Sequence, residues 1–570
     1  MTDTVATSVA APIVREFREI LLWPLQLERL QDGRQIQKHW EVLQSLPGGS
    51  AWSEVEDEFT GDPKQFQERH YHEFVTFLPA VQRFLYGEGP HKAAHARPVE
   101  SSLKVFRRRD IAAVRIVPSD GDEPVVLKIA HIDLYFFYDL DVVILAVEVF
   151  GNDIPLDTAQ DLLFRFGRAY PPYWESGVRG ATCAARTEFL DAAGNVLAAS
   201  DFGERAKYLE FVCEHRAPLI SSHWDFVMRP LVLHTSDEPG PLRYRQLEYY
   251  RMPVMAFLAL DEPGRLTRGD YVRIGLLSGP GNPGEVPFSE EYLRGFEHRY
   301  CYDRHFGLAG AAGVNATRML TGGHNLIAVG NAASGFYVDS ETGFLSQFRH
   351  QYFLLFLIAH LHKAALLMLS NRLAVAIQDL DIYDVESVKR FKRTIRQSHE
   401  TFLRFTHRYW FHEVSIQVQA REIFAMIARH LETDELYGEV RDEMLDMESY
   451  LDSDNVRRQA NVVVRLTVIT TVGLVGTTAT GFLGMNLIAA AESPLAVKLF
   501  YFALVFIPVV LLLLYTIVKS KRLSDFFEAL SDERVGPRDK LRTLFGVWSR
   551  PNRSRARARA RAGIGDITGR

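Results

Sequence analysis

The sequence predicts an α/β N-terminal domain, then a long α-helical stalk and two C-terminal transmembrane α-helices. Three observations lead to this fold class. Short apolar runs alternate with helical patterns over residues 1–345, helical periodicity is almost unbroken over residues 346–461, and two long apolar segments lie within residues 462–518. A basic tail, residues 519–570, completes the predicted organisation.

The N-terminal region shows the patterns of a mixed α/β fold. The runs Val125–Ile129 and Leu134–Phe150 are rich in β-branched and aromatic residues, as strands are. Apolar residues recur at helical spacing in Thr158–Arg168, and Asp157 stands where it could cap that helix. We expect Ser53–Asp62, which is acidic, to be a surface loop.

Composition narrows the function classes. Hydrophobic residues make up 47% of the 570 residues and charged residues 24%, which suits a folded chain with at most a short membrane domain. The net charge of -6 gives no indication of a nucleic-acid partner. The three cysteines are far apart, which argues against a disulfide framework and fits a reducing cytosol. No nucleophile elbow, P-loop or metalloprotease motif appears, and no secretory signal, so we expect neither an enzyme nor an exported protein.

The sequence of the stalk region predicts a set of long helices. From Leu345 to Asn461 the sequence has one glycine, Gly438, and no proline, and apolar residues recur at helical spacing. The only breaks predicted are at Asp379–Asp384 and around Glu432–Gly438. The last helix then begins near Asp434 and continues into the first apolar segment.

One run within this region is apolar enough to resemble a membrane span. It is Tyr352–Leu369, and it carries His360, His362 and Lys363 at its middle. Polar and charged groups at the centre of a span are costly, so we predict a buried helix of the helical region instead. His360 and His362, two residues apart on a helix, are expected to face different ways.

The two predicted spans cover about 462–484 and 497–518. Each has the roughly 20 residues that a hydrocarbon core requires. The first is rich in Thr and Gly, which suits a helix packed against others or lining water. Basic residues flank the pair on its outer sides, so both termini are expected in the cytosol and only the connection around Glu492 outside.

The first span ends in the triplet Gly484-Met485-Asn486. This part of the chain resembles the CorA family of magnesium transporters. The resemblance rests on the triplet at a helix end, the long helix before it, the connection containing Glu492, the second span and the basic segment that follows. The resemblance covers the stalk and the two spans. It implies a homopentamer in a bacterial inner membrane, with the first span innermost. The resemblance also implies a gated channel, in which cytosolic magnesium bound between the subunits favours the closed state.

A physical argument from the residues points the same way. At 100° per residue, one narrow face of the first span alternates bulky apolar groups with hydroxyls and bare backbone. This predicted pore face consists of Val463, Leu466, Thr470, Leu474, Thr477, Gly481 and Gly484. In several copies, the apolar residues would form rings able to close a pore by dewetting, and the hydroxyls would form rings able to contact ion-bound water. One helix cannot enclose a pore, so several copies are needed.

Asn486 would add a ring of amide oxygens at the outer end. Because Mg²⁺ gives up its inner waters reluctantly, a neutral ring can hold the hydrated ion without trapping it. The alternative is that Thr and Gly allow close helix packing and Asn486 ends the helix as a cap.

Regulatory metal ligands are less defined. Glu439, Asp442, Glu443 and Asp446 in the stalk are candidates, and an ordinary solvated charged face is the alternative. The predicted function is passive conduction of a divalent cation, Mg²⁺ first, with no cofactor, in an oligomer embedded in lipid. Zinc, cobalt or nickel transport by a related branch and a membrane-anchored cytosolic sensor are the other hypotheses.

Overall fold

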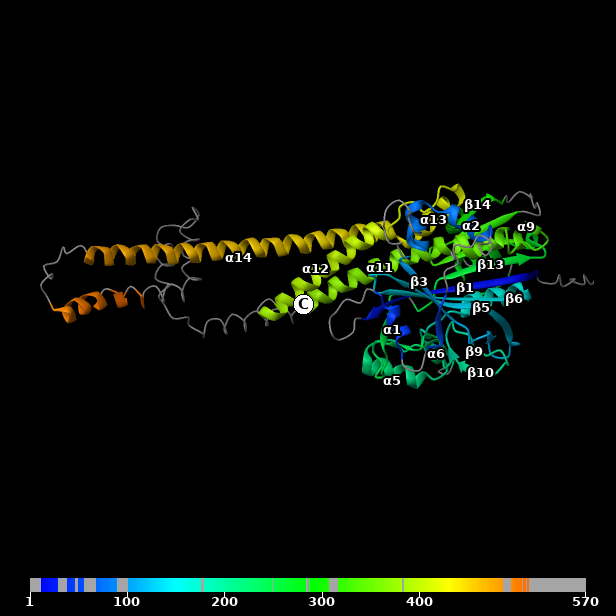
Figure 1. Cartoon of the computed structure of the whole chain (residues 1–570). Coiled ribbons are helices and arrows are strands. Elements are labelled where there is room, and N and C mark those ends of the chain that lie inside the picture. Colours follow the sequence, from blue (N-terminus) through cyan, green and yellow to red (C-terminus); the bar gives the residue numbers. More distant parts are fainter. Residues whose placement is uncertain are drawn as a thin grey trace, which may run out of the picture. The chain divides into compact units, whose positions relative to one another are not determined.

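The structure is a computed structural model of the chain, shown in Figure 1. It describes residues 12–28, 38–46, 50–55, 68–89, 101–175, 179–248, 250–282, 285–286, 288–306, 316–381, 384–484, 494–504, 506–508 and 510–511. The chain divides into two compact units, Met1–Met444 and Leu445–Arg570.

The first unit is organised by a 14-stranded sheet in the order β10-β9-β4-β5-β6-β1-β13-β16-β15-β14, with β2 and β3 attached at β5 and β11 and β12 attached at β1. Its strands are β1 (Ile13–Glu28), β2 (Trp52–Glu54), β3 (Leu103–Arg108), β4 (Ala113–Val117), β5 (Val125–Phe137), β6 (Val142–Pro155), β9 (Arg186–Leu190), β10 (Val196–Ala199), β11 (Leu231–Leu233), β12 (Leu242–Gln246), β13 (Val254–Leu260), β14 (Cys301–His305), β15 (Thr317–Thr321) and β16 (Asn325–Asn331). A separate two-stranded sheet joins β7 (Trp174–Glu175) to β8 (Arg179–Gly180). The mixed α/β prediction is therefore confirmed for this part of the chain.

The long strand β1 lies at the centre of the sheet. It pairs antiparallel with β6 from Ile13 to Gln26, and on its other side with β13 and then β12. The pair β13–β16 is parallel, as is β11–β12, so the sheet is mixed. Both faces of β1 are buried, which explains its nearly continuous apolar sequence.

Helices cover both faces of this central part of the sheet. α4 and α11 each pack against β1 and β6, and register places alternate residues of β1 toward opposite faces. The helices are α1 (Trp40–Gln44), α2 (Glu68–Thr76), α3 (Pro79–Tyr86), α4 (Leu156–Arg165), α5 (Arg205–His215), α6 (Ser222–Met228), η1 (Pro263–Arg265), α7 (Arg268–Leu276), α8 (Glu290–Tyr300), α9 (Gly335–Val338), α10 (Phe344–Gln347), η2 (Phe348–Tyr352), α11 (Phe353–Gln378), α12 (Val385–Arg408), α13 (Val418–Leu431) and α14 (Thr433–Gly484).

Several local predictions need correction. The run Leu134–Phe150 is not one strand, because β5 turns into β6 through Tyr138–Asp141. Asp157 does not cap α4: the chain passes from β6 directly into the helix, Pro155 takes the cap position, and Asp157 lies in the first turn. There its charge still suits the helix N-terminus. The predicted loop Ser53–Asp62 begins within β2, and its end lies outside the described residues.

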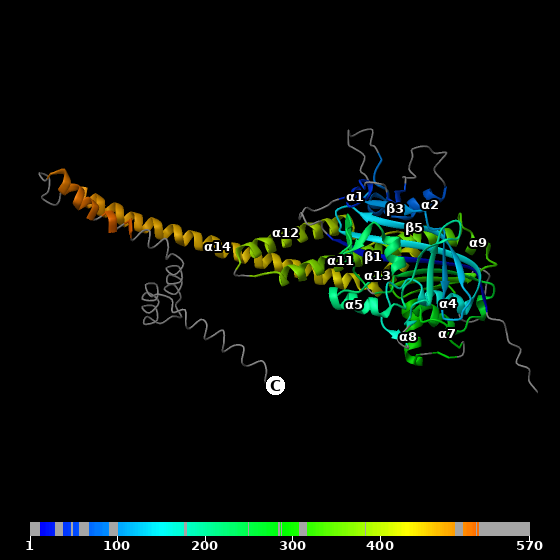
Figure 2. The same ribbon diagram turned by 90° about the horizontal axis from the view of Figure 1, so that it is seen from below.

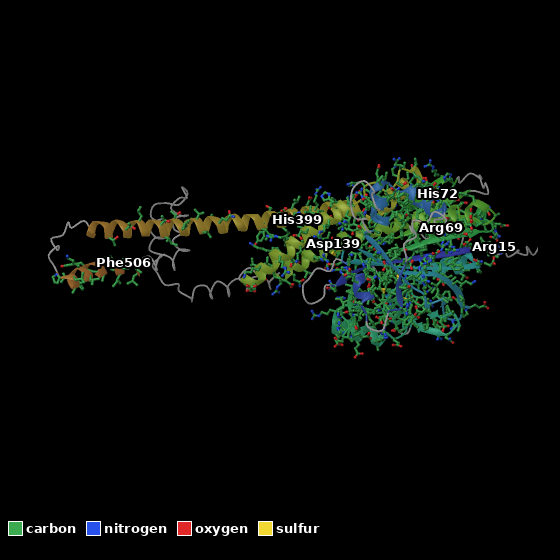
Figure 3. The ribbon with its side chains drawn as sticks, viewed as in Figure 1. Arg15, Arg69, His72, Asp139, His399 and Phe506 are labelled. Atoms are coloured by element: carbon green, nitrogen blue, oxygen red, sulfur yellow. The ribbon has the colours of Figure 1, made fainter. Side chains whose placement is uncertain are left out.

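The helical part follows the prediction with one exception. α11 and α12 lie side by side in both views (Figures 1 and 2), joined across the predicted break at Asp379–Asp384. Asp384 caps α12 by accepting bonds from the backbone of Glu386 and Ser387. Asp139, between β5 and β6, lies beside α12 (Figure 3), where Arg404 contacts its carboxylate at 3.3 Å.

The unpredicted break is 409–417, where the sequence contains no glycine or proline. Tertiary contacts override helix formation there. The buried Tyr409 hydroxyl donates to the carbonyl of Tyr138, and the Ser415 hydroxyl donates to the carbonyl of Thr76 at 2.6 Å. The backbone N–H of Leu78 also donates to the carbonyl of Val414 at 3.0 Å, which ties the segment to the start of α3.

Among the described residues, one helix, Phe344–Gln378, is long and apolar enough to cross a membrane, and 83% of its most apolar window is buried inside the unit. The prediction that Tyr352–Leu369 is a buried helix is therefore confirmed. The two predicted C-terminal spans are not shown: residues 462–484 form the end of α14, and the second segment is described only in part.

Candidate functional site

The predicted pore face lies on α14, in the part of that helix that belongs to the second unit. Its members are exposed in the single chain: Val463, Leu466, Thr470, Leu474, Thr477, Gly481 and Gly484. The exposed fraction is 63% for Leu466 and 68% for Leu474. Because α14 is one continuous helix from Thr433 to Gly484, the predicted 100° spacing applies along this whole face.

Threonine side chains on this part of α14 use their protons within the helix. The Thr470 hydroxyl donates to the carbonyl of Leu466 at 2.8 Å, and the Thr477 hydroxyl donates to the carbonyl of Gly473 at 2.9 Å. This is the back-bonding to the carbonyl four residues earlier that Thr often adopts within helices. Each hydroxyl oxygen keeps acceptor capacity, and a water bound to a cation needs such an acceptor.

The outer motif is described only at its first residue. Gly484 is exposed and is the last residue of α14, so the helix ends where the triplet begins. Met485, Asn486 and Glu492 lie outside the described residues. Of the second predicted span, the structure describes residues 497–504, 506–508 and 510–511, and the apolar side chains described there are largely exposed.

The four acidic candidates of the stalk are all exposed on α14: Glu439, Asp442, Glu443 and Asp446. Their spacing places them on one side of the helix. Partial burial, and then the neighbouring charge of Glu439, raise the pKa of Glu443. Arg441 contacts Asp442 at 3.1 Å. An acidic helix face of this kind fits the solvated alternative as well as a metal site, and the regulatory role stays a prediction.

A second group of possible ligands lies in the first unit, and the sequence analysis did not predict it. Glu248, in the connection from β12 to β13, His324, in the turn from β15 to β16, and His360, on α11, present one ligand atom each within 4.8 Å of one another. His324 Nδ1 lies 3.4 Å from one oxygen of Glu248, and His360 Nδ1 lies 3.9 Å from the other. We call these three residues the Glu–His–His cluster.

Backbone contacts hold the cluster in place. The carbonyl of His324 accepts a hydrogen bond from the N–H of Val254, the first residue of β13. Asn325 anchors the turn, since its side chain accepts from Gly322 and donates to the carbonyl of Gly275. Gly323 has φ +84, a conformation that favours glycine, and a side chain there would meet the backbone of α13 at His430.

The cluster combines burial with unsatisfied polar atoms. The side chain of His360 is 0% exposed and that of Glu248 is 6% exposed. Within the described residues, both oxygens of Glu248 and both ring nitrogens of His360 are buried without a hydrogen-bond partner. Burial favours the neutral acid of Glu248, but His360, His324 and Lys363 outweigh it and lower the pKa. Partial burial also lowers the pKa of His324 to about 4. At neutral pH the carboxylate is ionised and the His324 ring is neutral, which are the forms that bind metals.

Two other buried glutamates lie on the central strands with opposite electrostatics. Glu148 on β6 is contacted by Arg349 at 2.6 Å, by His131 at 2.7 Å and by Arg18 at 3.1 Å. Burial opposes its charge, but His131 and Arg349 hold its pKa well below the usual range. Glu19 on β1 has no hydrogen-bond partner among the described residues, and burial raises its pKa to about 8, against a weaker attraction from Arg251.

Sequence patterns could not have identified the Glu–His–His cluster. Its members are separated by long stretches of chain and follow no metal-binding spacing, and the sequence relates His360 only to its neighbours within the apolar run Tyr352–Leu369. His362 does face another way: its Nε2 contacts the carbonyl of Tyr409 at 2.6 Å. Comparison with family models, curated proteins and solved structures found no match to this chain.

Proposed function

We propose that this chain is a subunit of a CorA-type membrane channel that conducts divalent cations, with Mg²⁺ as the principal ion. In this proposal α14 crosses the bilayer from about Val462 to Gly484, the segment 497–518 returns, and both termini lie in the cytosol. Several copies, five by the family resemblance, surround the pore with α14 innermost.

The observation that carries the proposal is the exposed face of α14. Leu466 and Leu474 expose more than half of their side chains, and hydroxyls and glycines alternate with them. Leaving a Leu side chain in water forgoes about 1.5–3 kcal/mol per residue. Lipid or other copies of the helix would remove that cost. A stripe that alternates apolar and hydroxyl groups suits a water-filled axis better than lipid alone.

The chemistry of the face suits a hydrated ion. With its proton committed to the helix, the oxygen of Thr470 or Thr477 offers an acceptor to the waters around a cation. Asn486 would offer amide oxygens at the outer mouth. Such neutral rings hold Mg²⁺ through its water shell, which the ion sheds reluctantly.

No energy-coupling site is required by this mechanism. The membrane potential supplies about 2.3 kcal/mol per charge per 100 mV, and so about 4.6 kcal/mol for a divalent cation entering the cytosol. Apolar rings such as that of Leu474 would close the pore by dewetting.

Ion flux into liposomes that contain the purified full-length chain tests the proposal. We expect Mg²⁺ entry driven by an inside-negative potential, and little entry in Asn486→Ala protein of the same oligomeric size. Entry of Zn²⁺, Co²⁺ or Ni²⁺ without Mg²⁺ would favour the transition-metal branch. Absence of flux for all four ions, in protein that assembles, would favour a membrane-anchored sensor and reject the channel.

The membrane orientation has a separate test. A cysteine at Ser493 should react with an impermeant thiol reagent added to intact cells. The native Cys213 is exposed in the first unit and serves as the internal control, because it should react only after the cells are permeabilised. Labelling of Cys213 but not of position 493 in intact cells would contradict the proposed orientation.

A further inference from the structure

We propose that Glu248, His324 and His360 form a binding site for one transition-metal ion of the Zn²⁺ class in the first unit. Nothing in this inference depends on the channel proposal, because the cluster lies wholly within Met1–Met444.

The spacing of the ligand atoms is close to what such an ion requires. Zn²⁺ binds imidazole nitrogen and carboxylate oxygen at about 2.0–2.2 Å in tetrahedral geometry, which separates neighbouring ligand atoms by about 3.4 Å. His324 Nδ1 is 3.4 Å from Glu248, and His360 Nδ1 is 3.9 Å from the other oxygen of that carboxylate. The separation between His324 and Glu248 matches this value, and the separation between His360 and Glu248 is slightly longer.

The donor types select the class of ion. Two imidazoles and one carboxylate are the set that Zn²⁺ accepts in open sites, with a fourth position left for water. Mg²⁺ prefers oxygen ligands in octahedral geometry and keeps several waters, which a site with two ring nitrogens does not match. Discrimination against Mg²⁺ is therefore built into the ligands.

An ordinary buried hydrogen-bonded pair does not account for the cluster. At 3.9 Å, His360 Nδ1 and Glu248 are too far apart for a hydrogen bond. Within the described residues, both ring nitrogens of His360 lack a partner although the side chain is fully buried. A bound ion would occupy Nδ1 of His360 and the carboxylate of Glu248, two of these buried and unsatisfied groups.

Lys363 is a nearby positive charge that opposes a bound cation. Its Nζ lies 3.5 Å from His324 Nε2, one helical turn from His360 along α11. Binding of an ion at Nδ1 would place the ring proton on Nε2, so Lys363 would have to turn away into solvent. Removing its charge should therefore help metal binding.

A bound ion would link three segments that are distant in sequence: the connection before β13, the turn before β16, and α11. Since α11 also packs against α12 and α13, the ion would stabilise the contact between the sheet and the helical part of this unit.

The test uses the purified full-length chain after treatment with a chelator. Binding of Zn²⁺ is measured by competition with a chromophoric chelator, Co²⁺ binding by its visible d–d absorption, and unfolding by the Tm. We expect one tight Zn²⁺ per chain, a tetrahedral Co²⁺ spectrum, and a Tm that rises with Zn²⁺. A large excess of Mg²⁺ should not displace the Zn²⁺.

The variants separate the site from adventitious binding. His324→Ala should weaken Zn²⁺ binding at least tenfold and remove the Zn²⁺-dependent rise in Tm. Since His324 lies in an exposed turn, this variant is expected to fold. Lys363→Ala should bind Zn²⁺ at least as tightly as the wild type, and His298→Ala, which removes an exposed histidine of α8, should behave as the wild type. Equal Zn²⁺ affinity in the His324→Ala variant and the wild type, or displacement by Mg²⁺, would overturn the inference.

Discussion

α11 and the C-terminal part of α14 are both long, apolar helices, but their surroundings differ. In α11 nearly every apolar side chain is buried by the sheet and by neighbouring helices of the same unit. In α14, Leu466 and Leu474 remain mostly exposed although the helix is continuous from Thr433 to Gly484. Length and apolarity alone point to α11 as a membrane helix. The buried state of α11 shows that uncovered apolar surface, as on α14, is the better guide to the helix that the proposed channel would place in a membrane or against partner copies.

The largest expected effect is on the buried helix. Leu357→Asn in α11 removes a fully buried Leu and places an amide in the core, so it should destabilise the first unit by about 3–5 kcal/mol. Thermal or chemical unfolding of the purified chain measures this loss. The conservative change Leu357→Met should cost less than about 1.5 kcal/mol. A Leu357→Asn protein as stable as the wild type would contradict the assignment of α11 to the core.

The next largest effect is expected at two buried glutamates of the sheet. Replacing each with Gln should change the free energy of unfolding in opposite directions. The pKa of Glu19 is raised to about 8 in the folded state, so its contribution to stability is full below pH 4 and is lost as pH rises toward 8. Glu19→Gln should therefore gain stability relative to the wild type between pH 5 and pH 8, by about 3 kcal/mol.

Glu148 is the matched control for Glu19, because its folded-state pKa is depressed. Its contribution is present above the unfolded pKa and is lost only as pH falls through the acid range. Glu148→Gln should lose stability relative to the wild type at neutral pH, and that difference should shrink at low pH. The free energy of unfolding, measured from about pH 2 to pH 8, covers both ranges and distinguishes the two variants. The same trend in both variants would contradict this description of the sheet.

The corresponding change on the exposed helix should leave stability almost untouched. Leu474 is 68% exposed, so Leu474→Asn should not lower the Tm of the first unit. If Leu474 forms an apolar ring in the assembled pore, the variant should instead wet the constriction and raise the resting ion leak of liposomes severalfold. A leak equal to that of the wild type, in protein of the same oligomeric size, would remove Leu474 from the gate.

Sequence reasoning succeeded where one physical pattern dominates. It identified the mixed α/β character of the first unit, the burial of Tyr352–Leu369 despite its hydropathy, and the start of the last helix near Asp434. It failed where contacts distant in sequence decide. The break at 409–417 comes from bonds such as that of Ser415 to Thr76, and the Glu–His–His cluster exists only because three separate elements meet.

The measurement that tests the central claim most directly is Mg²⁺ uptake by Asn486→Gly in cells that lack their own magnesium transporters. If Asn486 supplies the outer ring of amide oxygens, the Gly variant should assemble but fail to restore growth at low Mg²⁺. If Asn486 only ends the helix, glycine suits that position at least as well, and uptake should match the wild type. Failed growth with an intact oligomer is the result that the channel account predicts. Growth restored to the wild-type level would contradict the proposed role of Asn486 in ion selection.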